Sequence, residues 1–337
     1  METDSETLLK NTSRSLYLSI QALPRSMREP FAIAYLLCRY ADTIADTHLL
    51  SAEKRSGWIE QFPKLVEEQP SQEVLALTRE ISGKSDNKYE EELIKNLPLC
   101  LQRFNKIADD FKPLVLEVVH AVCEGMKIDL TFFPPQPKNT VKAFEKKEQL
   151  EHYCRLMGGK PGLFWSKLIA KTTPIAAPEE NFLTWGQQIG DALQIVNILR
   201  DLPKDLQLGR CYFPLEDLQA AGISPNDLCQ AENSPRFEPV KQKWIRWGLN
   251  RLNAAKPYFA QIPKTQLGQR AAVAWPILWT ADTLFKVSNT PDLLDASKRV
   301  KIPRSTVYFT LACTPALWVS NTAFSAWLTR KINRFSN

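Results

Sequence analysis

Apolar residues recur at helical intervals along most of this chain of 337 residues, and signals for β-strands are scarce. In the stretch REPFAIAYLLCRYADTIADTHLL, the apolar Phe31, Tyr35, Leu36, Cys38 and Leu50 leave a separate polar face. The chain has only 12 glycines and no Asn-Gly or Asp-Gly dipeptide, the pairs that typify β-hairpin turns. These patterns predict an all-α protein.

Prolines and small polar clusters separate the predicted helices, for example at 132–139, 171–181 and 231–239. The chain shows no internal repeat, no low-complexity linker and no change of composition along its length. A hydrophobic content of 44% is enough for one large core. We therefore expect one all-α domain, a closed bundle of many helices.

The charge and the cysteines limit the class of protein. The net charge of +6 is mild and no block of five basic residues occurs, so nucleic-acid binding is not indicated. An anionic ligand or an anionic membrane surface would suit this charge. The seven cysteines are odd in number, widely spaced and without a CxxC pair, which predicts free thiols in a reducing compartment. The acidic start METDSETLLK lacks an apolar run, so we expect no signal peptide and a cytoplasmic protein.

The end of the chain has a different composition. Residues 305–329 carry no charge and are flanked by Arg304 and Arg330. The stretch is long enough to span a bilayer, but Pro315 and several polar residues make it only weakly apolar. Three alternatives stay open: a buried last helix with an amphipathic tail, peripheral membrane contact, and a spanning anchor.

Two pairs of aspartates stand at helical spacing. Asp42 and Asp46 are four residues apart, as are Asp201 and Asp205, and Asn197 lies one turn before the second pair. Residues four apart share one face of a helix, where like charges repel. A divalent cation would relieve this repulsion, and Mg²⁺ fits best because it takes few protein carboxylates and completes its shell with water and phosphate oxygens.

Arginines accompany both pairs. Arg39 lies one turn before Asp42, and Arg200 and Arg210 bracket the second pair. Arginine forks bind phosphate oxygens through two donors at once, so acids and arginines around one cavity predict a Mg²⁺–diphosphate site. The alternative is that these are solvated helix faces with intrahelical salt bridges, which contribute little each.

Other chemistries find no support in the sequence. There is no G-x-S-x-G, no G-x-G-x-x-G and no P-loop, and the three histidines show no ligand spacing. The glycine-rich GGKPG at 158–162 stands alone, and in a helical protein it indicates a helix break or a close approach of two backbones.

Five stretches together resemble the squalene/phytoene synthase family, in order and spacing over about residues 10 to 312. They are NTSRSLYLSIQALP, AYLLCRYADTIADT, HYCRLMGGKPG, QIVNILRDLPKDLQLGRCYFP and AVAWPILWTADTLF followed by KRVKIPRS. The resemblance implies an isoprenoid-synthase helical bundle around a central cavity, with the two aspartate motifs facing each other across it. It implies a head-to-head trans-prenyltransferase domain at 1–312 and an apolar and basic tail at 313–337.

Within this family the chain looks most like squalene synthases. That implies two farnesyl diphosphates as substrate, a cyclopropylcarbinyl diphosphate intermediate, two to three Mg²⁺ ions, and NADPH as hydride donor. It also implies a monomer at the membrane surface, held peripherally or anchored by the C-terminal segment, with no nucleic-acid partner.

The resemblance assigns roles to residues of this chain. The implied metal ligands are Asp42, Asp46, Asn197, Asp201 and Asp205, and Tyr153 would handle the proton lost on forming the cyclopropane. The implied substrate and diphosphate contacts are Ser13, Arg14, Ser15, Tyr35, Arg39, Gln194, Arg200 and Arg210. Further residues implied to line the cavity are Tyr40, Phe164 and Trp275. The implied cofactor contacts are Asn197, Arg200, Lys301 and Arg304.

The chain departs from the family pattern in places. Thr47 and Lys204 stand where many members have acids, and Pro203 removes a helical donor, so we expect the helix to end or bend near it. Two further hypotheses remain. One is a phytoene or dehydrosqualene synthase of the same fold without hydride transfer. The other is a non-catalytic, membrane-associated helical scaffold, which would have no need of the four aspartates.

Overall fold

The computed structural model describes residues 8–10, 16–46, 50–69, 71–82, 88–134 and 140–335. It is built almost entirely of helices, so the all-α prediction is confirmed; a pair of two-residue strands is the exception in the described part of the chain. The chain forms two compact units, one of residues 1–134 with 167–172 and the other of 135–166 with 173–337. The interpretation of 1–312 as a single domain stays a prediction.

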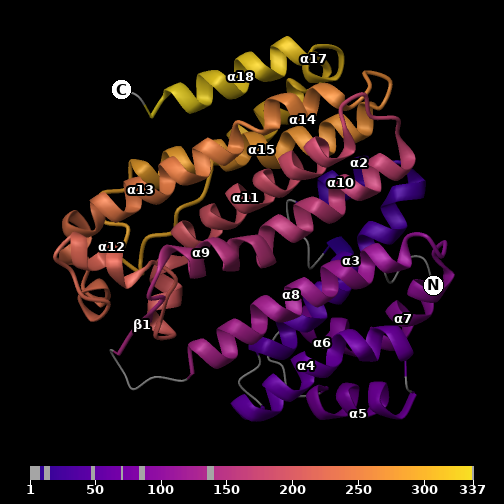
Figure 1. Ribbon diagram of the computed structural model, residues 1–337, viewed down its shortest axis with the longest axis horizontal. Helices are drawn as coiled ribbons and strands as arrows, with labels where there is room; N and C mark the ends of the chain where they lie inside the picture. Colours follow the sequence, from indigo (N-terminus) through magenta and orange to yellow (C-terminus); the bar gives the residue numbers. More distant parts are fainter. Residues whose placement is uncertain are drawn as a thin grey trace. The chain divides into compact units, whose positions relative to one another are not determined.

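The first unit is an assembly of helices around α3 and α8 (Figure 1). Its helices are α2 (Leu16–Ala22), α3 (Arg25–Asp46), α4 (Ala52–Glu68), α5 (Ser71–Ile81), α6 (Lys88–Lys95), α7 (Leu97–Lys106) and α8 (Lys112–Phe132). α3 packs against α8, α4 and α7, and its Ile33, Leu37 and Ile44 are buried in the core. Of the predicted apolar face, Phe31, Leu36 and Leu50 are buried, whereas Tyr35 and Cys38 are half-buried.

The second unit is arranged around the long helix α11, which packs on α13, α14 and α15 (Figure 1). Its first elements are β1 (Lys142–Ala143), α9 (Lys147–Cys154), the π-helical turn η1 (Arg155–Gly159), α10 (Lys160–Thr172), α11 (Glu179–Gln207), β2 (Arg210–Cys211) and α12 (Leu215–Ala220). They are followed by η2 (Asn226–Cys229), η3 (Ala231–Asn233), α13 (Ser234–Leu252), α14 (Ala255–Gln261), α15 (Leu267–Ser288), α16 (Arg304–Ala312), α17 (Thr314–Val319) and α18 (Asn321–Asn333).

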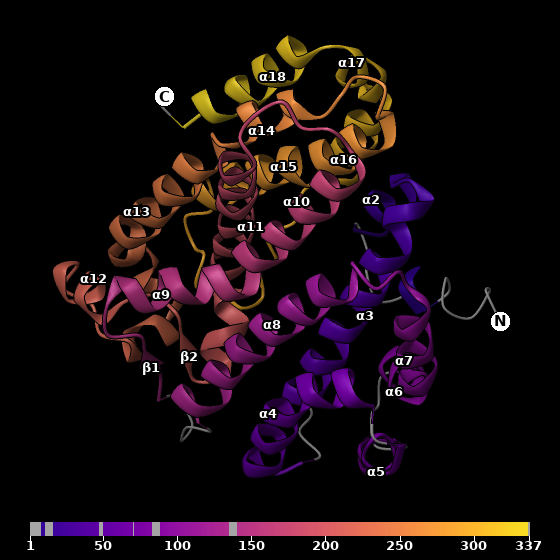
Figure 2. The ribbon, with the colours of Figure 1, turned by 45° about the vertical axis from the view of Figure 1, so that its right-hand side comes forward.

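The two short strands are parallel and link the end of α11 to the start of α9 (Figure 2). Lys142 pairs with Arg210 and Ala143 with Cys211. This ladder places the segment after the second aspartate motif beside the chain that leads to Tyr153.

Prolines end some helices but not others. α10 ends at Thr172 and α11 begins at Glu179, so the predicted break at 171–181 is confirmed. Five other prolines lie inside helices that continue past them: Pro30, Pro63, Pro203, Pro239 and Pro276. A proline removes one backbone donor, and a helix held by tertiary packing on both sides can bear that loss.

The glycine-rich segment at 158–162 forms a close contact between two backbones, as the sequence predicts. A Cβ atom on Gly158 would lie 2.3 Å from the carbonyl oxygen of Gly190, and one on Gly162 would lie 2.3 Å from that of Gly186. We call the positions 158, 159, 162, 186 and 190 the glycine seam. The seam lets η1 and the start of α10 lie directly on α11.

The segment at 305–329 forms parts of three separate helices, α16, α17 and α18. In the ranges that the structure covers, no helix has the length and apolar character needed to cross a membrane. α18 packs on α14 and α15, with Phe324 and Leu328 fully buried. The fold thus supports a buried last helix for α18 and gives no support to a spanning anchor, while peripheral membrane contact stays a prediction.

Polar groups tie this C-terminal segment to α15. The fully buried Arg270 donates to the carbonyl oxygens of Ile262 at 2.7 Å and Leu317 at 3.1 Å. Lys331 donates to both carboxylate oxygens of the buried Asp282 at 2.6 Å, and Arg334 donates to one of them at 2.8 Å. The tail is thus an integral part of the second unit.

Candidate active site

The second aspartate motif lies on one face of α11. Asn197, Asp201 and Asp205 follow one another at intervals of one turn, and Gln194 precedes them by three residues. Asn197 is exposed, while Gln194, Asp201 and Asp205 are half-buried. The predicted grouping of these oxygens on a single helical face is present in the structure.

α11 does not stop at Pro203. It continues through this residue and ends at Gln207, one turn later, with Pro203 itself buried. Asp205 therefore still belongs to the helix and keeps its place one turn beyond Asp201. The predicted end of the helix near Pro203 therefore lies one turn further along the chain, at Gln207.

Arg200 neutralises Asp201. Its Nε and Nη2 donate to the two carboxylate oxygens of Asp201 at 2.9 and 2.5 Å. The hydrogen bond to Asp201 is the largest cause that raises the pKa of Arg200, and the charge of Asp205 adds to it. The repulsion expected between the two aspartates is thus partly offset by the protein's own arginine. Arg210 lies on β2 and is half-buried.

The first aspartate motif shows the same arrangement in the other unit. Asp42 and Asp46 lie in the last turns of α3, with Asp42 half-buried and Asp46 exposed. Arg39, one turn before, forms an ion pair with Asp42. Tyr35, a further turn back, is half-buried. These two ion pairs are the intrahelical salt bridges of the alternative interpretation, and binding of phosphate by the arginines stays a prediction.

The two motifs belong to different units, since Asp42 and Asp46 lie in the first and Asp201 and Asp205 in the second. That they face each other across a central cavity stays a prediction.

Each motif offers donors suited to Mg²⁺. In the described part of the chain, no group of three or more His, Cys, Asp or Glu side chains is placed to hold a metal ion. Each motif instead supplies a pair of carboxylates, and α11 adds the amide oxygen of Asn197. Mg²⁺ keeps several waters and takes further oxygens from substrate phosphates, so a pair of hard oxygen ligands fits it.

Tyr153 lies in a buried aromatic cluster of the second unit. Its ring stacks on that of Tyr212 with centroids 4.7 Å apart, and its hydroxyl lies 3.4 Å from the Tyr212 hydroxyl. Phe144 contacts both rings, at 6.0 and 5.7 Å between centroids. Sequence reasoning did not single out Tyr212, although it stands in the GRCYFP segment directly after the second motif.

The remaining predicted contacts are placed only in part. Ser13, Arg14 and Ser15 lie outside the described residues. Lys301 and Arg304 are exposed, and Arg304 is the first residue of α16.

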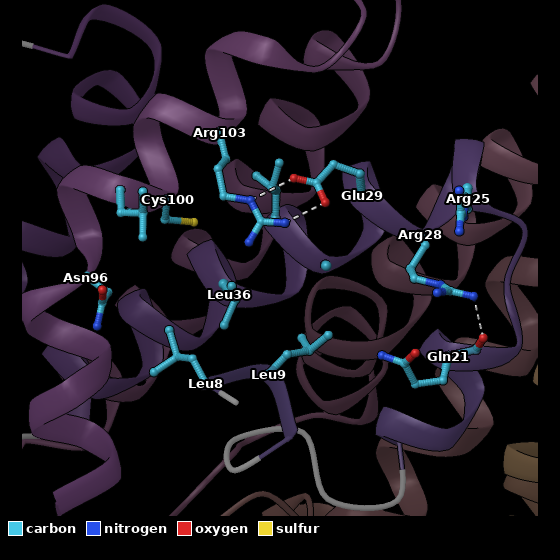
Figure 3. Close-up of a pocket in the computed structure, with 13 residues that line it drawn as sticks. Leu8, Leu9, Gln21, Arg25, Arg28, Glu29, Leu36, Asn96, Cys100 and Arg103 are labelled. Carbon is cyan, nitrogen blue, oxygen red and sulfur yellow. Dashed lines mark hydrogen bonds and ion pairs between the residues drawn. The ribbon is translucent and has the colours of Figure 1, made fainter. Parts of the chain in front are cut away.

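A cavity of about 690 Å³ lies within the first unit, between α3, α7 and the segment that begins at Leu8 (Figure 3). Three of its four charged side chains are bonded to one another or to the backbone. Arg103 donates to both oxygens of Glu29 at 2.8 and 2.6 Å, and Arg28 donates to the carbonyl oxygen of Gln21 at 2.7 Å. Neither Asp42 nor Asp46 lines this cavity, so it is separate from the first aspartate motif.

Known proteins share the sequence pattern of this chain. The sequence pattern of the squalene/phytoene synthase family matches residues 9–306. The squalene synthase of Schizosaccharomyces pombe is 24% identical over 294 residues, which are 87% of this chain and 61% of that protein. The bifunctional lycopene cyclase/phytoene synthase of Podospora anserina is 23% identical over 311 residues, 90% of this chain and 49% of that protein. The chain thus spans only about half to three fifths of the length of these curated relatives.

Solved structures agree on the fold. A ligand complex of TcSQS superposes with a TM-score of 0.77 at 18% identity, covering 98% of this chain and 95% of that one. A dehydrosqualene synthase superposes with a TM-score of 0.66 at 20% identity, covering 94% and 96%. The helical architecture is therefore the isoprenoid-synthase fold. With a family match over nearly its whole length, the chain belongs to the squalene/phytoene synthase family.

Proposed function

We propose that the protein joins two farnesyl diphosphates head to head to presqualene diphosphate, and then reduces this intermediate to squalene with NADPH. The observation that carries the proposal is the repeated aspartate motif. Two helices, α3 and α11, each present a pair of carboxylates at one-turn spacing, and in each pair the first carboxylate is held by an arginine.

The ion pairs suggest how diphosphate binds. Both oxygens of Asp201 are occupied by Arg200, and Asp42 is paired with Arg39. When Mg²⁺ is bound by the carboxylates, it supplies the positive charge that stabilises a departing diphosphate. Arg200 and Arg39 are then released to donate to phosphate oxygens, with Arg210 as a third donor. Each arginine thus offsets aspartate repulsion before the substrate binds and phosphate charge afterwards.

We assign the other substrate contacts to Tyr35, Gln194 and the segment Ser13, Arg14 and Ser15. Gln194 supports this assignment, because it is half-buried one turn from Asn197 on α11. Tyr35 is half-buried one turn from Arg39 on α3.

Tyr153 is the group proposed for the proton of the first step. The condensation forms a carbon–carbon bond, releases one diphosphate and loses one proton on closing the cyclopropane. The Tyr153 hydroxyl is buried in a mostly aromatic environment and donates to the Tyr212 hydroxyl at 3.4 Å, so as it accepts the substrate proton it can pass its own proton through Tyr212 to the diphosphate released in the same step. The same apolar surroundings would keep water from the cationic reaction centre.

NADPH, when bound, supplies the hydride of the second step. Lys301 and Arg304 would hold its phosphate groups, since both are exposed cations within four residues of each other. Asn197, which is exposed on α11, and Arg200 complete the proposed cofactor contacts.

A second candidate is a phytoene or dehydrosqualene synthase that makes no use of NADPH. It is favoured by the similarity to a phytoene synthase domain and to a dehydrosqualene synthase structure. One assay separates the two candidates: the purified protein is incubated with farnesyl or geranylgeranyl diphosphate and Mg²⁺, with and without NADPH, and the lipids are identified by mass spectrometry. Squalene that forms only with NADPH supports the first candidate, and a polyene formed without NADPH supports the second.

We further propose that the protein contacts a membrane surface through α16 and α17. Tyr308, Phe309 and Val319 are 65%, 62% and 63% exposed, well above the other large apolar side chains of the described chain. Phe309 contacts the ring of Trp327 on α18, with centroids 5.9 Å apart, and the exposed Arg330 lies one turn after Trp327. Exposed aromatic residues next to cations are the composition of an interfacial contact with anionic lipid.

A further inference from the structure

The helix that carries Tyr153 contains an irregular turn. α9, η1 and α10 follow one another without a break, and η1 is a π-helical turn of five residues. π-helical turns are rare, and they occur where other contacts hold them and frequently at functional sites. Tyr153 lies two residues before this turn, so the turn sets how the tyrosine enters its aromatic cluster.

The glycine seam presses η1 onto α11. A Cβ on Gly190 would lie 2.1 Å from the carbonyl oxygen of Gly158, closer than any side-chain atom can approach. The next residue of α11 is Asp191, and its Oδ1 would lie 2.3 Å from a Cβ on Gly159. The carboxyl group of Asp191 therefore rests directly on the π-helical turn.

Asp191 is deeply buried and only loosely paired. Its side chain is 1% exposed, and Oδ2 lies 3.5 Å from Nε of Arg251 and 3.7 Å from Nη2 of Arg155, beyond ordinary hydrogen-bond lengths. Oδ1 has no hydrogen-bond partner among the described residues. Arg155 is the first residue of η1, and Arg251 comes from α13.

The other groups around this carboxyl do not complete its pairing. Glu151 and Cys154 of α9 also face it, and Glu151 instead accepts a hydrogen bond from Nε1 of Trp247 at 2.8 Å. Burial raises the pKa of Asp191 to about 6, against the opposing effects of Arg155 and Arg251.

Such a carboxylate does not serve stability at neutral pH. Burial favours the neutral form of Asp191. Its contribution to the stability of the folded protein is therefore full below the pKa of an unfolded-state aspartate, and it is lost as the pH rises through the folded-state pKa of about 6. An asparagine would fill the same space without a buried charge. The ionised carboxylate at this position therefore calls for another role.

We propose that Asp191 is a positioning residue that holds Arg155 and the π-helical turn against α11 and so fixes Tyr153 on Tyr212. The ionised carboxylate draws Arg155 of η1 and Arg251 of α13 toward one point of α11. Loss of the charge releases Arg155, and the turn that follows Tyr153 is then free to relax toward ordinary helix. The effect on catalysis rests on the role proposed above for Tyr153.

The test uses Asp191→Asn in the full-length protein, with presqualene diphosphate formation measured without NADPH from pH 5 to 8. We expect kcat at pH 8 to fall about 10- to 100-fold, since a shift of about 1 Å in a reacting group has that scale of effect. KM for farnesyl diphosphate should change little, because the substrate contacts are untouched. The wild-type kcat should decline below a pH of about 6, and the variant should lack this decline.

Thermal unfolding separates positioning from damage to the fold. Tm of Asp191→Asn at pH 8 should equal or exceed that of the wild type, because a buried charge has been removed. The matched control is Asp217→Asn, since Asp217 is also buried in the second unit but bonds Lys243 and Trp244 on α13 rather than a residue of η1. It should lower Tm and leave kcat near the wild-type value.

Two outcomes would overturn the proposal. One is an Asp191→Asn protein with the kcat and pH profile of the wild type. The other, independent of turnover, is a crystal structure of this variant at pH 8 with the π-helical turn and the Tyr153–Tyr212 stack unchanged. If the wild-type protein forms no presqualene diphosphate at all, the proposed function fails, and the crystal structure alone decides the role of Asp191.

Discussion

Two aspartates at one-turn spacing on a helix repel each other unless a positive charge lies nearby. In this protein Asp42 and Asp201 each meet an arginine of their own helix, so neither faces its neighbouring aspartate uncompensated. Partly exposed ion pairs of this kind contribute little to stability, which makes them easy to exchange for another partner. The arginines are thus suited to transfer from carboxylate to phosphate at small cost.

The first residue-scale prediction concerns Arg200→Lys. Lysine keeps the charge but cannot place two donors on one carboxylate or phosphate, so kcat/KM for farnesyl diphosphate should fall about 10- to 100-fold, the loss of one charged hydrogen bond. Steady-state kinetics measure this. Arg246→Lys is the matched control, an exposed arginine on α13 of the same unit, and should leave kcat/KM unchanged. Equal kinetics for the two variants would contradict the role of Arg200.

The second concerns the glycine seam. Gly190→Ala brings a Cβ to within 2.1 Å of a backbone oxygen, so η1 must move away from α11. We expect a loss of about 2 to 4 kcal/mol in the free energy of unfolding, measured by urea denaturation. Gly57→Ala is the control, because a Cβ there meets nothing within 4 Å in helix α4. It should raise stability by about 0.5 to 1 kcal/mol.

At the residue scale, sequence spacing predicted contacts between residues of the same helix. It did not predict contacts between residues from two separate segments. The pairing of Arg39 with Asp42 lies within one turn and follows from sequence positions alone. Tyr212 and Tyr153 are 59 positions apart, and only the β1–β2 ladder and the packing of α9 bring them together. Asp191 stands among apolar residues of α11. An aspartate is usually exposed, so the sequence alone does not show that this one is buried.

At the scale of helices, the uncharged C-terminal segment is divided among three elements. An uncharged stretch of membrane-spanning length is here cut into α16, α17 and α18, because Pro315 and Ser320 stand where α17 and α18 begin. Its polar backbone groups find partners in the protein rather than in lipid, as the bond from Arg270 to the Leu317 carbonyl shows. Composition alone cannot reveal such partners.

The anchoring of α18 leads to a third prediction. Lys331→Met removes a bond to the buried Asp282, which then keeps only Arg334. Removing one partner of a buried ion pair lowers the free energy of unfolding by about 3 to 5 kcal/mol. Because Arg334 is partly exposed and stays bonded to Asp282, we expect a loss of about 3 kcal/mol or less. Urea unfolding gives the value. Arg330→Met, at an exposed neighbouring position, should change stability by less than about 0.5 kcal/mol. Similar losses for both would show that α18 is held by other contacts.

A fourth prediction tests the surface of α16 and α17. Flotation with vesicles containing anionic lipid should recover the wild-type protein, and the double variant Tyr308→Ser and Phe309→Ser should remain unbound. Neutral phosphatidylcholine vesicles should bind less, since the exposed Arg330 near Phe309 is attracted to an anionic surface. Leu267→Ser, another exposed apolar side chain of the same unit, serves as control and should bind normally. Binding by the double variant at the wild-type level would exclude this surface.

Helical periodicity predicted the main elements, because long amphipathic segments have few alternative ways to bury their apolar residues. It could not predict that α11 passes through Pro203, since this depends on the packing around α11. Nor could it predict η1, because a π-helical turn comes from the contact with α11 rather than from local preference.

At the scale of the whole molecule, each of the two units carries one of the two aspartate motifs. The fifth prediction tests both motifs with inorganic diphosphate and Mg²⁺, which together should raise Tm of the wild-type protein by ligand linkage. Asp42→Asn in the first unit and Asp201→Asn in the second should each remove most of that rise. Asp109→Asn and Asp227→Asn are exposed controls in the respective units. Loss in only one of the two motif variants would mean that diphosphate is held by one unit alone.

The glycine seam also limits how this protein can vary. At positions 158, 186 and 190 any residue other than glycine would place its Cβ too close to a neighbouring backbone or side-chain atom. No single substitution there is therefore expected to be tolerated. A selection from a randomised library should therefore return glycine at these positions, whereas position 57 should accept many residues. Variation in this part of the second unit must therefore come from the side chains around the seam, because the backbone contact itself admits no gradual change.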